Sequence, residues 1–397
     1  MGPLLSRLGL LNLRPGADHY MELARRSTGL SDFGSYDVRT AADKMLHMLC
    51  NEADLHLFGR IASTQLTLRN LENCLRVQQA FVDEPELDDI PVEEPIIIVC
   101  TPRTGSTLLH NLLAQHPNVR APRMWELHRP CPPPHPALEQ TDARIRKSDR
   151  EFGMYYRLIP EMRAIHYFAP LAVEECTHLF LNTFTCRMSF AAMANLTSYA
   201  DWVMKLDMAP AYREYKRTLK ILARNYPRKT LVLKSPGHLL CMEALHEVFP
   251  KARIVHIHRD PATAAGSFCS LTEAVQISVR RNVDVAEIGN TWNRLWTPAV
   301  MDSIRWRETG ELNILDLDFR DVIADPSGIA ASVFEYFGID APAALHTNIA
   351  RYLGENPKDM YGSHQYDLHR YGLDRRALLE QYAPYIDFFD VALDAGS

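Results

Sequence analysis

The sequence predicts an α/β protein with a central parallel sheet flanked by helices. Two observations predict this fold class. Four short runs rich in apolar residues have the length and composition of buried strands, at residues 96–100, 230–234, 253–258 and 312–317. Each run is followed by apolar residues at helical spacing, at residues 106–115, 238–249, 261–280 and 321–337. Such strand–helix alternation is typical of doubly wound sheets, which bind ligands beyond the carboxyl ends of the strands.

The chain divides into three segments by composition. Residues 17–82 carry apolar residues at helical spacing, and an acidic, proline-bearing stretch follows them. We therefore expect a helical N-terminal extension at residues 1–94, an α/β domain at residues 95–340, and a C-terminal tail at residues 341–397 that packs on the site. Residues 117–229 are too long for a simple crossover between parallel strands. We expect them to form a largely helical insertion that caps the site.

Composition and charge restrict the class of function. Hydrophobic residues make up 47% and charged residues 23% of the 397 residues, as in an ordinary globular protein of enzyme size. The formal net charge of −6 argues against bulk binding of nucleic acid. A bound anion must therefore be held by a local site.

The cysteine pattern and the hydropathy indicate a cytoplasmic protein. Eight cysteines occur without CxxC pairs, which suits reduced thiols better than disulfides or a zinc site. No segment has the length and hydropathy of a membrane span. The first 16 residues contain a short apolar stretch, for which packing on the protein body is preferred over weak contact with a membrane surface. The sequence leaves the formation of a homo-oligomer open.

The loop after the first predicted strand has the parts of an anion cradle. In "TPRTGSTLL", Gly105 lets the backbone approach a ligand, and Ser106 and Thr107 begin a helix whose amides point outward, together with that of Thr104. Arg103 supplies a cation. Because Gly105 stands where a triphosphatase loop has lysine, the loop favours a phosphate bound without an obligatory metal.

Two further strand ends carry cations. In "HRDPATAAGS", Asp260 is a predicted N-cap, and Ser267 lies two turns along the same helix, so that Arg259 and Ser267 are predicted to grip one anion. In "LKSPGHL", Lys234 ends a strand, and His238 follows in the first turn of a helix. Both ends should open onto the same crevice as Arg103.

Together these stretches resemble the family of sulfotransferases that use 3′-phosphoadenosine-5′-phosphosulfate (PAPS), in its bacterial form with a P-loop-like fold. The loop at residues 101–107 resembles the family's 5′-phosphosulfate loop, and residues 259–267 resemble its 3′-phosphate motif. "LKSPGHL" is similar to the lysine motif between them. The late segment "LDLDFRDVIADPSGI" is also similar, with Asp318 in place of the usual Glu. The resemblance covers about residues 95 to 340.

The resemblance implies transfer of a sulfuryl group from PAPS to a hydroxyl, or in second place an amine, of a small-molecule, lipid or glycolipid acceptor. Adenosine 3′,5′-bisphosphate (PAP) is released, and no metal is expected. Lys234 and Arg103 are expected to stabilise charge on the bridging oxygen. Glu126 in "MWELH" is the first candidate for the base, His238 the second and His128 the third. The pair Glu174–Glu175 is interpreted as cap surface or structural pairing.

The chain also departs from the family's pattern. Leu108 stands where cytosolic animal members carry a tryptophan that stacks on adenine, and His238 is four residues after the lysine instead of two. Their late Arg-Lys-Gly grip on the 3′-phosphate has no clear match, and Gly362, Ser363 and His364 are candidates for that part. Two alternatives stay open: a P-loop kinase-like phosphotransferase that uses ATP and Mg²⁺, and a catalytically silent protein that binds PAPS or PAP.

Overall fold

A computed structural model of the chain describes residues 16–160, 168–188, 196–356 and 367–394. In this part of the chain, five parallel strands form one sheet in the order β2-β3-β1-β4-β5. The strands are β1 (Ile96–Cys100), β2 (Val119–Arg120), β3 (Thr230–Lys234), β4 (Arg253–His258) and β5 (Asn313–Asp318). The predicted parallel sheet is confirmed. β2 was not predicted, because two residues are too few to form a pattern.

The sheet brings three predicted loops to one edge. β1 is the central strand, and all five of its residues are buried. Ile98 pairs with Lys234 on one side and with Val255 on the other, so β3, β1 and β4 end close together. The loops that follow these strands therefore lie at one edge of the sheet.

The helices that follow the strands differ in detail from the prediction. They are α5 (Ser106–Leu113), η4 (Pro236–Cys241) with α13 (Met242–Val248), α14 (Pro261–Ile277), α16 (Phe319–Ala324) and α17 (Pro326–Tyr336). The stretch at residues 238–249 begins as a 3₁₀ helix. The stretch at residues 321–337 is two helices, because Asp325 ends the first and caps the second through the amide of Gly328.

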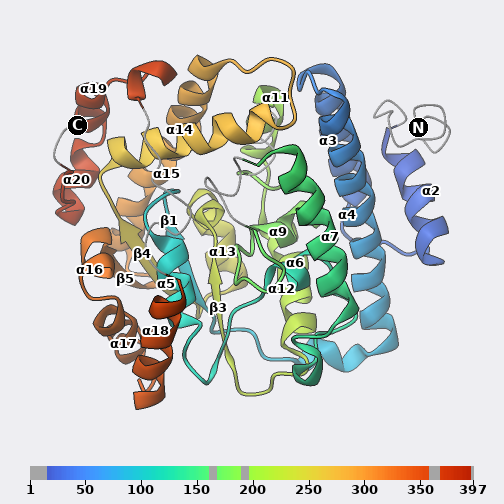
Figure 1. Ribbon diagram of the computed structural model, residues 1–397, viewed down its shortest axis with the longest axis horizontal. Helices are drawn as coiled ribbons and strands as arrows, with labels where there is room; N and C mark the ends of the chain where they lie inside the picture. Colours follow the sequence, from blue (N-terminus) through green and yellow to red (C-terminus); the bar gives the residue numbers. More distant parts are fainter. Residues whose placement is uncertain (1–15, 161–167, 189–195, 357–366, 395–397) are drawn as a thin grey trace.

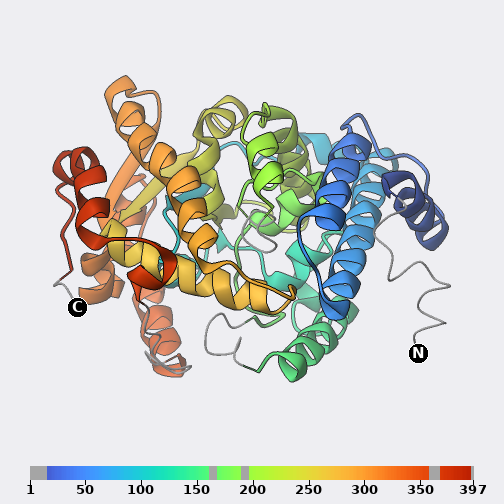
Figure 2. The ribbon, with the colours of Figure 1, turned by 90° about the horizontal axis from the view of Figure 1, so that it is seen from above.

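The N-terminal segment forms three helices, α2 (Gly16–Thr28), α3 (Val38–Asn51) and α4 (Leu57–Asp83). Most of their buried apolar residues belong to the same core as residues of the insertion and of β1, β3 and β4, whereas Val77 and Phe81 of α4 pack with Leu87 and Ile221. Figures 1 and 2 show these helices at one end of the molecule and the C-terminal helices at the other. The predicted N-terminal apolar stretch lies outside the described residues, except for Gly16.

The insertion is largely helical in its described part. It contains α6 (Met124–His128), η2 (Pro136–Leu138), α7 (Ala143–Leu158), α9 (Thr177–Phe180), η3 (Leu181–Thr183), α11 (Thr197–Val203) and α12 (Ala209–Ala223). The chain continues with α15 (Val285–Thr309), α18 (Ala343–Glu355), η5 (Leu368–Tyr371), α19 (Arg375–Gln381) and α20 (Ala383–Phe389).

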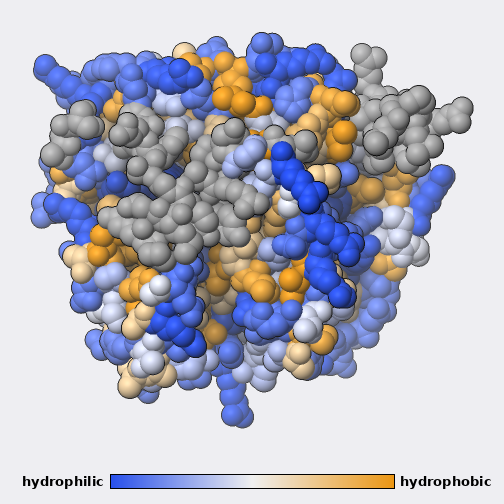
Figure 3. Space-filling view, in the orientation of Figure 1, coloured by the Kyte–Doolittle hydropathy of each residue, from blue (hydrophilic) through white to orange (hydrophobic). Residues whose placement is uncertain are grey.

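Among the described helices, none combines the length and the hydropathy needed to cross a bilayer. On the face shown in Figure 3, most of the visible coloured residues are hydrophilic and the apolar ones form small, separate groups.

Candidate active site

The loop after β1 forms a nest of backbone amides. Arg103 and Gly105 both have left-handed backbone conformations, with φ of 69° and 75°. Alternating left- and right-handed residues turn successive N–H groups toward one concave point. Gly105 is the N-cap of α5, and no side chain caps the first amides of this helix. The helix start can therefore bind an anion with its backbone.

Gly105 is required by packing as well as by its backbone angles. A Cβ atom at this position would lie 2.7 Å from Cδ2 and Cε2 of Phe319. Phe319 begins α16 directly after β5, and its ring also lies 4.1 Å from the guanidinium carbon of Arg259. One aromatic ring thus contacts both the loop after β1 and the Arg259 guanidinium.

Two hydrogen bonds join the two anion motifs. Arg103 Nε donates to Ser267 Oγ at 3.0 Å, and Arg259 Nη1 donates to the backbone oxygen of Arg103 at 2.8 Å. The joint action of Ser267 with Arg259 on an anion stays a prediction. The Ser267 hydroxyl contacts Arg103, and Arg103 contacts Arg259, so the two motifs lie side by side.

Thr104 and Ser106 support the loop from inside. Both side chains are buried, and Thr104 Oγ1 donates to the backbone oxygen of Thr101 at 3.1 Å. The hydroxyls therefore hold the shape of the loop, and its backbone amides remain the groups suited to an anion. The tail candidates Gly362, Ser363 and His364 lie outside the described residues.

Lys234 is a buried cation at the end of β3. Its side chain is 1% exposed, and Nζ donates to Thr107 Oγ1 at 3.2 Å and to Glu175 Oε1 at 2.7 Å. Burial disfavours the ammonium, but the carboxylates of Glu175 and Glu174 outweigh this and raise the pKa of Lys234. The ammonium therefore stays charged beside the phosphosulfate loop.

Glu175 is the candidate residue that the sequence analysis did not select. It precedes α9 in the insertion, and its neighbour Cys176 donates its amide to the backbone oxygen of Lys234 at 3.0 Å. Of the two interpretations of Glu174 and Glu175, the surface one is wrong, because Glu174 is buried and the Glu175 side chain is only 17% exposed. The ion pair of Glu175 with Lys234 agrees with the other one, structural pairing. No spacing rule connects a loop residue with a lysine 59 positions later, so the single sequence carried no signal for the pair.

Glu126 lies in a different environment from the one expected of a base. It is 0% exposed on α6, with Arg120 Nη2 donating to Oε1 and the amide of Arg123 donating to Oε2, both at 2.9 Å. Arg120 also donates to the backbone oxygen of Leu222 and lies over the ring of Tyr226. One carboxylate oxygen thus belongs to a buried ion pair that joins α6 to the end of α12, and the other accepts from the amide before α6.

The two histidine candidates are also buried. His238 Nδ1 lies 2.7 Å from Tyr212 Oη, its Nε2 lies 3.2 Å from Cys176 Sγ, and burial lowers its pKa to about 3. His128 Nδ1 lies 3.2 Å from Arg69 Nη1, and burial holds its pKa well below the ordinary value. Both rings are therefore neutral at pH 7, and both nitrogens of His238 already have partners.

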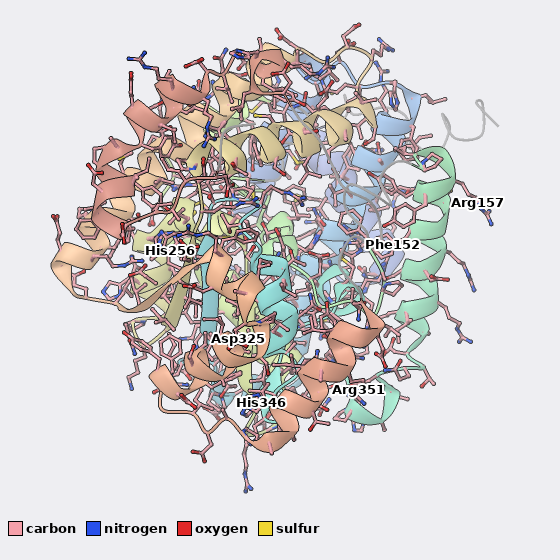
Figure 4. All side chains as sticks on the ribbon, turned by 60° about the vertical axis from the view of Figure 1, so that its left-hand side comes forward. Phe152, Arg157, His256, Asp325, His346 and Arg351 are labelled. Carbon is pink, nitrogen blue, oxygen red and sulfur yellow. The ribbon has the colours of Figure 1, made fainter. Side chains whose placement is uncertain are left out.

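A row of rings extends into the insertion from α9. The ring centroid of His178 lies 5.1 Å from that of His128, which lies 5.6 Å from that of Phe152. Phe152 stacks on Phe168 at 6.0 Å. Figure 4 shows Phe152 pointing from α7 toward the protein body, whereas Arg157 on the same helix points outward. The row begins at His178, the second residue of α9, which lies three positions after Glu175.

One group of potential metal ligands lies away from this crevice. Donor atoms of His256, His258 and Asp316 lie within 4.8 Å of one another. However, Arg307 Nη2 lies 2.9 Å from His256 Nδ1, and Arg307 Nε donates to Asp316 Oδ2 at 3.0 Å. A guanidinium therefore already supplies the positive charge that these atoms bind.

Comparison with known proteins identifies the family. Residues 95–343 match the family described as the sulfotransferase family. The chain is 24% identical over 341 residues to the omega-hydroxy-beta-dihydromenaquinone-9 sulfotransferase Stf3 of Mycobacterium bovis, across 79% of this chain and 80% of the relative.

Two crystal structures share the fold. Sulfotransferase STF1 of Mycobacterium tuberculosis H37Rv has a TM-score of 0.82 at 28% identity, and the match covers 92% of this chain and 98% of that one. Sulfotransferase STF9 of Mycobacterium avium has a TM-score of 0.84 at 28% identity, covering 96% and 98%. Because the family match spans more than half of the sequence and agrees with these structures, the chain belongs to the sulfotransferase family.

Proposed function

We propose that this protein transfers a sulfuryl group from PAPS to the hydroxyl of an apolar acceptor and releases PAP. The observation that carries the proposal is the pair of hydrogen bonds that join Arg103 to Ser267 and Arg259 to Arg103. These bonds hold two cations in one crevice, as a nucleotide with anionic groups at both its 5′ and 3′ positions requires.

The residues of the crevice fit this donor. The amides of residues 104–107, Arg103 and Lys234 would hold the 5′-phosphosulfate, and Arg259 with Ser267 would hold the 3′-phosphate. Within the described residues, the buried Nε of Arg259 has no hydrogen-bond partner. An unsatisfied buried donor is costly, so a phosphate oxygen at this atom would stabilise the complex.

PAPS supplies the sulfuryl group, and the protein supplies charge stabilisation and alignment. As the bond between sulfur and the bridging oxygen breaks, negative charge develops on this oxygen, which leaves as part of PAP. The Lys234 ammonium and the Arg103 guanidinium would stabilise this charge, because both are already positioned by Thr107 and Ser267. No step in this scheme calls for Mg²⁺.

We propose Glu175 as the base. Its side chain is partly exposed at the point where Lys234 and Thr107 meet, and its ion pair with Lys234 orients it toward the transfer centre. As the acceptor oxygen bonds to sulfur, its proton would move to a Glu175 oxygen. Glu126 is replaced in this role because both its oxygens already accept hydrogen bonds inside the protein.

The proposed acceptor is a hydroxylated, isoprenoid-like lipid. The name of the Mycobacterium bovis relative states that its acceptor is a hydroxylated menaquinone. In this chain, His178, His128, Phe152 and Phe168 form a row of rings next to the segment that carries Glu175. Such a row would suit an apolar body whose hydroxyl reaches the carboxylate.

The test is a transfer assay with matched acceptors. The protein is incubated with PAPS and an ω-hydroxylated menaquinone, with the same quinone lacking the hydroxyl, and with a total lipid and sugar extract. Mass spectrometry should find a product heavier by one SO₃ group from the hydroxylated quinone or from a hydroxylated lipid of the extract. PAP should be released in equal amount, with EDTA present.

The alternatives give different results. Phosphorylated products that require ATP and Mg²⁺ would show a kinase-like phosphotransferase. Tight binding of PAP without PAP release in the presence of any acceptor would show a catalytically silent nucleotide-binding protein. Sulfation of amines and not of hydroxyls would overturn the acceptor assignment alone.

A further inference from the structure

The C-terminal segment returns to the start of α14, at the 3′-phosphate motif. Asp260 is 0% exposed, and its Oδ1 caps α14 by accepting from the amides of Ala262 and Thr263. Its Oδ2 accepts from Arg375 Nη2 at 2.6 Å and from the amide of Asp394 at 3.0 Å. Arg375 Nη2 also donates to the backbone oxygen of Asp394 at 2.8 Å. Asp260, which follows Arg259 in the sequence, thus anchors Arg375 and Asp394.

These contacts place a carboxylate beside the cation proposed to bind the 3′-phosphate. Asp394 Oδ2 lies 3.7 Å from Arg259 Nε, too far for a hydrogen bond but within an ion pair. Both groups are partly exposed, at 37% and 23% of the side chain. Asp394 therefore neutralises Arg259 without satisfying its Nε.

Helix α20 is firmly packed against the end of β4. Tyr385 Oη lies 2.7 Å from His258 Nδ1, and the ring of Phe389 stacks on that of His258 at 4.3 Å between centroids. His258 ends β4 directly before Arg259. These buried contacts hold α20 against the strand end. Residues 391–394 alone would need to shift for the Asp394 carboxylate to leave Arg259.

We propose that the C-terminal tail is part of the nucleotide site, in which Asp394 is a counter-anion that a 3′-phosphate displaces from Arg259 and Arg375 is an additional cation at that phosphate. This inference rests on the proposed PAPS-dependent function. Arg375 meets this motif from the C-terminal segment, since its Nη2 donates both to Asp260 Oδ2 and to the backbone oxygen of Asp394. A phosphate and Asp394 repel each other, so they compete for one guanidinium.

The displacement gives the tail a role in selecting the nucleotide. A ligand without a 3′-phosphate would leave the Asp394–Arg259 pair in place and gain nothing from Arg375. A ligand with this phosphate would replace a single carboxylate charge with a group of higher charge, and would give Arg259 Nε an acceptor. The tail residues should therefore affect PAP and not 5′-AMP.

The experiment is titration calorimetry of the full-length protein with PAP and with 5′-AMP. Asp394→Asn should lower the Kd for PAP by about two- to tenfold, the range expected for removing a partly exposed competing charge. Arg375→Gln should raise the Kd for PAP by a similar factor. Neither variant should change the Kd for 5′-AMP, and the gain in Asp394→Asn should shrink as salt is raised. Asp387→Asn, with the same charge change at an exposed position of α20, is the matched control and should change neither Kd.

Each other outcome is informative. If wild-type protein binds PAP more tightly than 5′-AMP and the two tail variants leave both constants unchanged, the tail has no part in the site. If each variant changes the Kd for 5′-AMP by the same factor as the Kd for PAP, the effect is general electrostatics and the inference is wrong. If wild-type protein shows no preference for PAP, the PAPS-dependent function itself fails. Thermal unfolding of Arg375→Gln, compared with wild type, separates loss of the tail's fold from loss of a phosphate contact.

Discussion

Lys234 Nζ lies 2.7 Å from Glu175 Oε1, so a buried ammonium from the sheet meets a carboxylate from the insertion beside Thr107, in the first turn of α5. The lysine is anchored in β3, whereas the carboxylate belongs to a segment whose position depends on the packing of the insertion. The pair therefore joins the end of β3 to the insertion, and in our proposal it lies between the nucleotide and the acceptor.

Replacing the Glu175 carboxylate should remove transfer and preserve nucleotide binding. Glu175→Gln keeps the size of the side chain but takes away the proton acceptor, so kcat should fall by roughly 10²- to 10⁴-fold with little change in the Kd for PAP. Steady-state kinetics with PAPS and calorimetry with PAP measure the two quantities. Glu247→Gln, in an exposed ion pair with Arg213, is the control. Normal turnover by Glu175→Gln would exclude Glu175 as the base.

Replacing Glu126 should affect stability more than chemistry. Glu126→Gln leaves Arg120 as a buried charge without its carboxylate, for which a loss of about 3 to 5 kcal/mol in the free energy of unfolding is typical. Denaturant titration measures this loss, and kcat per folded molecule should stay near the wild-type value. A stable Glu126→Gln protein without turnover would return the role of base to Glu126.

Adding a methyl group at Gly105 should weaken both the fold and the nucleotide site. The new Cβ would lie 2.7 Å from the Phe319 ring, and φ of +75° is unfavourable for alanine. We expect Gly105→Ala to lower the melting temperature and to raise the Kd for PAP. Gly354→Ala in α18, where a Cβ meets no atom within 4 Å, should do neither. Equal behaviour of the two variants would contradict the packing argument.

The buried histidines should make the protein sensitive to mild acid. Burial lowers the pKa of His238 and of His110 to about 3, so both are neutral in the folded protein, whereas the unfolded chain binds protons below about pH 6.5. Stability is therefore lost as the pH falls from about 6.5 toward 3. At pH 5.5 each such histidine should reduce the free energy of unfolding by about 1.4 kcal/mol.

A pair of variants isolates the contribution of His238. Urea unfolding at a series of pH values should show a shallower acid-side slope in His238→Gln than in wild type. His369→Gln, at an exposed position, should keep the wild-type slope. An unchanged slope in His238→Gln would show that His238 is not neutral in the folded protein.

The parts of the fold that the sequence predicted are those encoded in local patterns. β1 is a run of five apolar residues, and Gly105 lies in a strand-to-helix loop, so the sheet and the phosphosulfate loop followed from composition and spacing. Arg259 and Lys234 followed because parallel strands end at one edge of a sheet.

The parts that were missed depend on contacts between distant segments. Glu175 reaches Lys234 only because the insertion folds back over the sheet. Both oxygens of Glu126 have partners, from Arg120 and from the amide of Arg123, and Leu222 in turn holds Arg120. The hydrogen bond between Ser267 and Arg103 also joins distant segments. No periodicity within a single chain reports such pairings. The sequence therefore indicated Arg103, Lys234, Arg259 and Ser267 as one group, but it did not indicate which side chains contact one another.

The most direct test of the central claim is the crystal structure of the complex with PAP. The account predicts the 5′-phosphate at the amides of residues 104–107 beside Lys234, and the 3′-phosphate on the Nε of Arg259. A nucleotide bound with its 3′-phosphate away from Arg259, or with its 5′-phosphate outside the loop that begins α5, would contradict it.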